Sequence, residues 1–500
     1  MLSLGGTRSL LVLCFSLCLA MGSPSAATGP QPLAMSQPRA TLFARSHRFA
    51  AHARPKTAVA CSGRGAGSFI GAHNNNVAAG TDAAVVDGYT NEACDPESAI
   101  VAGDANTISG GAESSILAGY NNYVSAVASS ITGGDYNDIS GVNSAIAAGD
   151  DNVVEATGSA IAGGNNNWLA ADWAFIGSGI GNAIVPAVNG GGSDSSGSVI
   201  DGGYGNEISA VVPNGSQFSS IGGGSANSLE GLESSIGGGA GNVLDASYSF
   251  IGGGYQNAVH NGAQYSTIDG GENNTVSGTS AVVGGGFGNV ASGQNATVPG
   301  GAANIAAGAG SFAAGLHSNA KHDGSFVFSD AVSNAAVLST SAANQFLVRA
   351  SGGVSFFSNP TLKSGVVLRA GSGSWASLSD RSMKTNVVAL DPAAILAKVT
   401  ALPITEWSYR TEEPAIRHVG PMAQDFFAAF GVGEDDRHIT TIDEDGVALA
   451  AIKGLQAENV ALAVQNARLT TALRQLDARA AKLEASVAAL IAREPAARQP

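Results

Sequence analysis

The chain is poor in charge, aromatic rings and cysteine. Charged residues make up 13% of its 500 residues, aromatic residues make up 6%, and there are four cysteines. Between residues 61 and 330, 23 acidic side chains stand against two basic ones, Arg64 and Lys321. So acidic a surface repels phosphate backbones, and we expect no nucleic-acid partner. With 68 glycines, the composition favours a repetitive, extended architecture over an ordinary globular enzyme.

The N-terminus has the layout of a secretory signal peptide, which we place at residues 1–27. Arg8 precedes an apolar run from Leu10 to Ala20, and small residues follow through Ala27. The run is too short for a comfortable membrane span, although an uncleaved anchor is the alternative. Cleavage after Gly22 or Ala27 would fit, and the protein is expected to be secreted or displayed at the cell surface.

Removal of the signal peptide leaves Cys61 and Cys94 as the remaining cysteines. In an exported protein the simplest interpretation is one disulfide, and two buried free thiols are the alternative. Neither cysteine has metal-ligand spacing around it, and we predict no metal and no cofactor. Residues 28–60 hold five basic residues and no acidic one, with Pro, Ala and Ser, and are expected to form a flexible lead-in.

From residue 68 onward the chain repeats with a period of mostly 15 residues. Each unit has a β-branched residue at position zero and an asparagine six residues later, and glycine stands at plus three except in the first unit, which has His73. The zero positions are Ile70, Val85, Ile100, Ile116, Ile131, Ile146, Ile161, Ile176, Ile200, Ile221, Ile236, Ile251, Ile268, Val283 and Val298. The asparagines are Asn76, Asn91, Asn106, Asn122, Asn137, Asn152, Asn167, Asn182, Asn206, Asn227, Asn242, Asn257, Asn274, Asn289 and Asn304.

So short a fixed period predicts a mainly β fold, a parallel solenoid in which each turn packs on the next. The β-branched residues would fill its core, the glycines would allow sharp turns, and the asparagines would form a hydrogen-bonded ladder and not a ligand site. The repeat resembles the left-handed β-roll heads of trimeric autotransporter adhesins, which implies a homotrimer. A calcium-binding β-roll is the rival, but its nonapeptide is absent. Longer steps to Ile200 and Ile221 predict loops.

Beyond the repeat, residues 325–378 are expected to form a β neck where three chains interlock. Three segments there have alternating apolar residues suited to strands, at 324–330, 344–350 and 353–357. These segments do not follow the 15-residue period of the repeat.

At Ser379 the composition changes, and Ser379 and Lys384 are the candidate catalytic pair. A serine becomes a good nucleophile when a base takes its proton, and a lysine can be that base if burial keeps it neutral. The hydroxyl could then attack the carbonyl of Leu378 and form an ester that water opens, which would cut the chain between Leu378 and Ser379. The alternative is a solvated polar turn.

Three sequence blocks support the catalytic interpretation. They are S-D-R-S-M-K at residues 379–384, R-H-V-G-P-M-A-Q-D at 417–425, and a D-G-containing entry into a helix at 442–456. Together they resemble the intramolecular chaperone domain of phage endosialidase tailspikes and other tail fibres. The resemblance implies that the domain assembles three chains and then cuts itself off, with Ser379 as nucleophile and Lys384 as base. Pro421 departs from the family pattern, which puts the local packing in question.

Helices are expected at 391–399 and 422–430 and a strand at 404–409, and a heptad repeat follows from Ile452. One seam of the heptads holds Ile452, Asn459, Asn466, Leu473, Ala480 and Val487, and the other holds Leu455, Leu462, Leu469, Leu476, Leu483 and Leu490. Six consecutive heptads predict a coiled coil, in which Asn459 and Asn466 would set the register. No strand set for a membrane barrel follows, so we expect no barrel anchor of its own.

These patterns predict a signal peptide (1–27), a lead-in (28–60), a β-roll head (61–324), a β neck (325–378), a small α+β chaperone domain (379–455), a coiled coil (456–492) and a tail (493–500). The leading hypothesis is an exported, adhesin-like trimeric fibre that cuts itself before Ser379, a single-turnover serine peptidase. One alternative is a fibre that keeps its C-terminal cap. The other is a tail-fibre-like protein that binds or degrades a polysaccharide. The expected ligand of the head is a host surface or a polysaccharide.

Overall fold

The computed structural model describes residues 61–72, 74–186, 192–210, 215–332 and 336–492. The predicted signal peptide, lead-in and tail, and His73, lie outside these residues. The chain divides into two compact units, one ending at Gly352 and the other beginning at Gly353.

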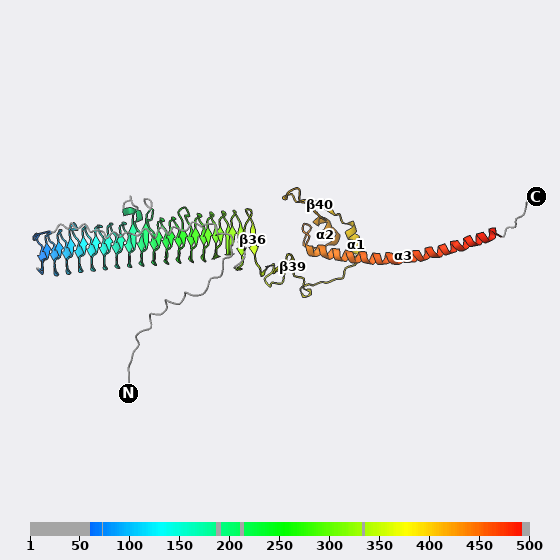
Figure 1. Cartoon of the computed structure of the whole chain (residues 1–500), viewed down its shortest axis with the longest axis horizontal. Coiled ribbons are helices and arrows are strands. Elements are labelled where there is room, and N and C mark those ends of the chain that lie inside the picture. Colours follow the sequence, from blue (N-terminus) through cyan, green and yellow to red (C-terminus); the bar gives the residue numbers. More distant parts are fainter. Residues whose placement is uncertain (1–60, 73, 187–191, 211–214, 333–335, 493–500) are drawn as a thin grey trace, which may run out of the picture. The chain divides into compact units, whose positions relative to one another are not determined.

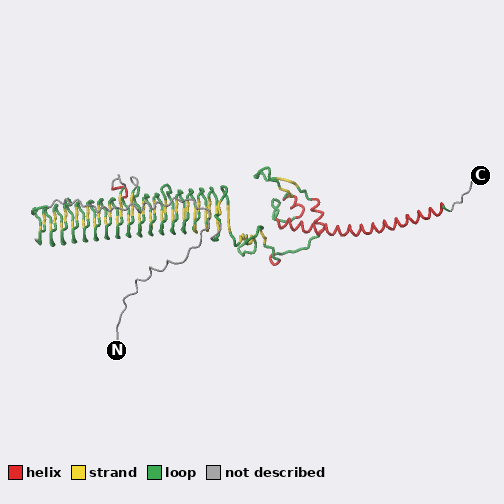
Figure 2. Tube along the Cα trace, in the orientation of Figure 1, coloured by secondary structure: helices red, strands yellow, loops and turns green. Residues whose placement is uncertain are grey.

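The first unit is a parallel β-solenoid, which confirms the fold predicted from the repeat (Figures 1 and 2). Each turn adds one short strand to each of two parallel ladders. The first ladder starts with β1 (Phe69–Ile70) and β3 (Ala84–Val85), and the second starts with β2 (Val77–Ala78) and β4 (Glu92–Ala93). Successive turns pair in register, so that each zero position lies beside the next. The longer steps to Ile200 and Ile221 keep this register.

Two buried apolar side chains per turn form one continuous core. They lie eight residues apart, as Ile100 and Ile108 do, and both are fully buried. Complete burial of such a side chain contributes about 1.5–3 kcal/mol, so the core is thin but long. Its stability depends on contacts between neighbouring turns.

The asparagine column is a hydrogen-bonded ladder, as predicted. Asn167 accepts hydrogen bonds at Oδ1 from the backbone N–H of Asn182 (3.0 Å) and from its Nδ2 (3.1 Å). Its own Nδ2 donates to the carbonyls of Gly163 (3.1 Å) and Gly179 (3.0 Å). The column is buried from Asn76 to Asn304, so each amide satisfies backbone groups that water cannot reach.

A second buried ladder is formed by serines two positions before the zero residue, and the sequence analysis gave it no role. The Ser114 hydroxyl donates to the Ala126 carbonyl (2.7 Å) and accepts from the Ser129 backbone N–H (3.0 Å). The serine hydroxyl thus bonds to buried backbone groups of the neighbouring turn, as the asparagine amide does in the other column.

The glycine at plus three is required by the close approach of consecutive turns. Gly119 has φ of +112°, and a Cβ there would lie 2.0 Å from the carbonyl oxygen of Gly134. A side chain at this position would meet both a left-handed backbone and a steric clash.

The first ladder runs past residue 324, the predicted end of the head. β32 (Phe312–Leu316), β34 (Phe326–Ser329) and β36 (Phe346–Arg349) pair in parallel through steps of 14 and 20 residues. Phe312, Phe326 and Phe346 stack with ring centroids 4.6 and 4.8 Å apart. The segment predicted as a neck therefore contains two parts, the last turns of the solenoid and a separate sheet that begins at Gly353.

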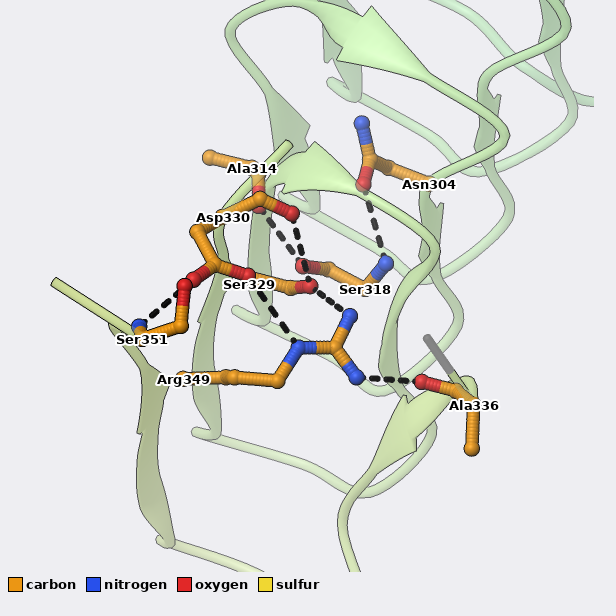
Figure 3. Close-up of polar contacts among 8 residues, drawn as sticks. All are labelled: Asn304, Ala314, Ser318, Ser329, Asp330, Ala336, Arg349 and Ser351. Carbon is orange, nitrogen blue, oxygen red and sulfur yellow. Dashed lines mark hydrogen bonds and ion pairs between the residues drawn. The ribbon is translucent and has the colours of Figure 1, made fainter. Parts of the chain in front are cut away.

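The asparagine column ends at Ser318 (Figure 3). The Oδ1 atom of Asn304 accepts from the backbone N–H of Ser318 (3.0 Å), and the Ser318 hydroxyl donates to the Ala314 carbonyl (2.6 Å). A hydroxyl thus takes the place that the next amide would occupy.

An ion pair closes this end of the solenoid (Figure 3). Arg349 donates from Nε to Asp330 (3.3 Å), and its other nitrogens donate to the Ser329 hydroxyl and the Ala336 carbonyl. The Ser351 backbone N–H donates to the other Asp330 oxygen (2.6 Å). Hydrogen bonds from Ser351, and then the contacts of Arg349, lower the pKa of Asp330, so the carboxylate remains an acceptor in mild acid.

The second unit begins with an antiparallel sheet of β37 (Gly353–Phe357), β38 (Gly365–Arg369) and β39 (Trp375–Ser377). The short 3₁₀ helix η2 (Arg381–Met383), the helices α1 (Pro392–Ala401) and α2 (Ala423–Phe430), and a hairpin of β40 (Thr405–Trp407) and β41 (His418–Gly420) follow. α1, α2 and β40 lie where two helices and a strand were predicted, whereas η2 and β41 were not predicted.

The long helix α3 (Thr441–Ile491) contains the heptads. Thr440 caps its first turn by accepting from the Asp443 backbone N–H. α1 packs closely on α3 at Gly454, where a Cβ would lie 2.4 Å from the Pro392 carbonyl oxygen. The leucines of the heptads are exposed in the single chain, and the coiled coil stays a prediction.

Candidate functional site

The candidate site begins where the sheet of the second unit ends. The Leu378 backbone N–H donates to the Gly365 carbonyl (3.3 Å), which holds the residue before the predicted cut against the start of β38. Ser379 follows, Asp380 is in extended conformation, and the chain then turns through η2.

Asp380 builds this turn. Its Oδ1 atom accepts from the backbone N–H (2.7 Å) and the hydroxyl (2.8 Å) of Ser382, as an N-cap residue does. The bond from the backbone N–H, followed by that from the hydroxyl, lowers the pKa of Asp380. The cap is therefore charged and able to accept at neutral pH.

The turn brings the two predicted catalytic residues together. Lys384 Nζ lies 2.7 Å from Ser379 Oγ and donates a hydrogen bond to it. This distance lies within the reach that proton transfer between a nucleophile and its base requires. For base action the bond must reverse, so that a neutral amine accepts the proton of the hydroxyl.

In the single chain the Ser379 and Lys384 side chains are exposed to solvent. Leu378, Ser379 and Lys384 are all exposed, whereas burial is the means by which a protein keeps a lysine uncharged. The segment after the dyad is also exposed to solvent, since Val387 and Val388 are 77% and 80% exposed.

The second sequence block, residues 417–425, runs through β41 of the hairpin into the start of α2. His418 stacks on Trp407 with ring centroids 4.8 Å apart, and its Nε2 atom lies 2.9 Å from a carboxylate oxygen of Glu412. Arg417 pairs with Glu406 across the same hairpin (2.8 Å). These contacts give the block a packing role.

Asp380 is the residue whose role the sequence reasoning missed. Its signal was present, because an aspartate two residues before a serine is a common turn former whose side chain accepts from the backbone ahead of it. The spacing of Ser379 and Lys384 places the dyad in one turn, and Asp380 holds that turn.

Cys61 and Cys94, predicted to pair, form a disulfide that ties residue 61 to the residue after β4. The Glu92 carboxylate lies within 4.8 Å of both sulfur atoms, and burial raises the pKa of Glu92. Because the bond occupies both sulfurs, we assign no metal to this cluster.

One of the comparisons with known proteins covers the residues of the candidate site. A search of curated proteins finds no match to this chain. Residues 379–431 match the family described as chaperone of endosialidase, and the match starts at the candidate nucleophile and ends one residue after α2. Residues 379–431 are therefore similar to the chaperone-of-endosialidase family, and they follow a β-solenoid, an order that fits a tail-fibre-like head with a chaperone domain after it.

Proposed function

We propose that this protein is an exported trimeric fibre whose C-terminal domain assembles three chains and then cuts its own chain between Leu378 and Ser379. The observation that carries the proposal is the 2.7 Å contact between Lys384 Nζ and Ser379 Oγ, at the first residue of the family match.

The reaction needs no separate substrate pocket, because nucleophile and carbonyl are neighbours in the chain. Neutral Lys384 takes the proton of Ser379 Oγ, and the oxygen attacks the carbonyl carbon of Leu378. The bond from that carbon to the Ser379 nitrogen breaks as the lysine returns the proton to the nitrogen. Water then hydrolyses the resulting ester, which frees the Leu378 carboxylate and restores the serine hydroxyl.

Assembly would switch the reaction on. The dyad is exposed in one chain, so its lysine lacks the burial that favours a neutral amine. Val387 and Val388 give neighbouring chains an apolar surface on which to pack. Cutting after assembly would remove the template and leave the trimer kinetically trapped.

The helix α3 supports association of several copies, and the number three rests on the two family resemblances. Its leucine seam is exposed, and other copies of the helix would cover it in a coiled coil. One 18-residue window of α3 has a mean hydropathy of 1.4, so by length and composition it could also cross a membrane. We favour the coiled coil because Asn459 and Asn466 lie in the seam, where they fix a register between helices but would be costly in lipid.

Mass spectrometry of the chain expressed without residues 1–27 tests the proposal, beside Ser379→Ala and Lys384→Ala. We expect the wild type to release a C-terminal fragment of 122 residues, 379–500, and both variants to stay whole. Ser382→Ala is the matched control in the same turn, because it keeps the dyad and should still be cut. Asp380→Ala should be cut more slowly.

An intact wild type that is trimeric by native mass spectrometry would refute self-cleavage. The protein would then be the first alternative, a structural fibre with a permanent C-terminal cap.

A further inference from the structure

Three side chains that can bind a metal ion meet at the N-terminal end of the solenoid. The sulfur atoms of Cys61 and Cys94 and a carboxylate oxygen of Glu92 all lie within 4.8 Å of one another, and all three residues are half-buried. Among the residues that the structure describes, no other three His, Cys, Asp or Glu side chains meet in this way. The sequence showed no metal-ligand spacing here because the two cysteines are 33 residues apart, and the fold brings them together.

Strand β4 places two of these side chains on one face of the solenoid. Glu92 begins the strand and Cys94 follows its end, while Ala93 between them is fully buried. Because side chains alternate along a strand, Glu92 and Cys94 both point away from the core. The Cα atoms of Cys61 and Cys94 are 5.7 Å apart, so two thiolates at these positions can reach one ion through Zn–S bonds of about 2.3 Å.

The Glu92 carboxylate lacks a partner for its charge. Among the described residues, no group donates a hydrogen bond to it and no basic side chain pairs with it. Burial raises the pKa of Glu92, since nothing offsets the loss of water around the charged form. A buried carboxylate of this kind is stabilised when a cation lies beside it.

We propose that these three residues form a binding site for zinc or a similar divalent ion when the Cys61–Cys94 disulfide is reduced. The intact bond occupies both sulfurs and excludes an ion, whereas its reduction frees them. The two thiolates and the Glu92 carboxylate are a ligand set that suits zinc, while magnesium and calcium favour oxygen ligands alone. No other described residue joins the group, so a tetrahedral ion keeps its fourth position for water.

Two electrons and two protons separate the two states of the site. A phosphine or a dithiol supplies the electrons, the S–S bond breaks, and each sulfur takes up a proton. The metal ion then displaces both protons and binds the two thiolates and the Glu92 carboxylate. A disulfide oxidant takes the two electrons back, re-forms the S–S bond and releases the ion. Residue 61 is thus tied to the end of β4 in both states, by a covalent bond or through the ion.

Titration with Co²⁺ tests the site in the chain expressed without residues 1–27, in which Cys61 and Cys94 are the remaining cysteines. The protein is reduced with a phosphine, separated from it without oxygen, and titrated with Co²⁺, whose bonds to thiolates absorb in the near ultraviolet. We expect one Co²⁺ per chain, displacement by Zn²⁺ and no displacement by excess Mg²⁺. The oxidised protein should not bind Co²⁺.

Glu92→Gln is the test variant, because it keeps the shape of the side chain and removes the carboxylate. It should weaken Co²⁺ binding to the reduced chain by at least about tenfold. Glu97→Gln is the matched control, because it removes the same charge from an exposed position soon after β4 and should bind as the wild type does. Circular dichroism should show both variants folded. Ser379→Ala should bind equally, so the result does not depend on self-cleavage.

Hydrogen exchange gives a second measurement. Zn²⁺ should restore to the reduced wild type the amide protection that the disulfide gives around β2 and β4, and it should restore none to Cys61→Ser.

Three results would overturn the proposal. They are no thiolate-to-cobalt absorption in the reduced wild type, equal binding by the wild type and Glu92→Gln, and binding of Co²⁺ by the oxidised protein. Equal binding would mean that the two thiolates hold the ion without Glu92.

Discussion

Removal of one buried asparagine should loosen the turns beside it. In Asn167→Ala the backbone N–H of Asn182, which is buried, loses its acceptor. An orphaned buried donor costs about 1–3 kcal/mol, and the lost amide bonds add about 1 kcal/mol. No other buried group of the described residues loses its last partner in this variant. The Gly179 carbonyl still accepts from the Asn165 backbone N–H, and the Asn152 side chain still accepts from the backbone N–H of residue 167. We therefore expect a local loss of about 3 kcal/mol.

Hydrogen exchange measures this loss where it occurs, because each turn of a solenoid contacts mainly its neighbours. A loss of about 3 kcal/mol should speed amide exchange around residues 175–184 by roughly a hundredfold. Asn165→Ala is the control, two residues away in the same turn, with an exposed side chain that bonds to Asp150 (3.2 Å). It should change exchange little. Equal effects of the two substitutions, or a change of less than about twofold in Asn167→Ala, would refute the ladder argument.

Two further predictions concern the solenoid. Gly119→Ala should destabilise it by about 3 kcal/mol, because the new Cβ would meet the Gly134 carbonyl in a left-handed backbone. Gly133→Ala, where nothing lies within 4 Å, should change urea unfolding by less than about 0.5 kcal/mol, and equal losses would contradict the steric account. Burial raises the pKa of Asp245, so the stability that its neutral form contributes is lost as pH rises through that raised pKa. Asp245→Asn should therefore raise the Tm at pH 7 but not at pH 3, and a lower Tm at pH 7 would be the contrary result.

The solenoid could be predicted from the sequence because its geometry demands one residue type at each position. Only glycine tolerates the approach of Gly119 to the next turn, and a buried amide at Asn167 satisfies backbone groups on both neighbouring turns. Such requirements repeat with the period, so they appear as columns of identical residues. The last turns lack them, because Phe326 and Phe346 hold the register by ring stacking through steps of unequal length.

The candidate site divides in the same way. The pairing of Ser379 with Lys384 is local, because one capped turn joins the two residues. Their spacing in the sequence was therefore enough to predict the contact. The burial that the proposed reaction requires of that lysine is not local. Lys384, Val387 and Val388 are all exposed in the single chain, so neither the sequence nor one chain specifies what would bury them.

The cap at Asp330 and Arg349 sets a limit that the ladder itself does not have. Each asparagine repeats the bonds of the one before it, so a turn gained or lost by recombination between units would leave every remaining bond in place. The ion pair has no counterpart in the repeating unit and can end the stack only once. A head with more or fewer turns would therefore keep the same ladder bonds and the same single ion pair at its end.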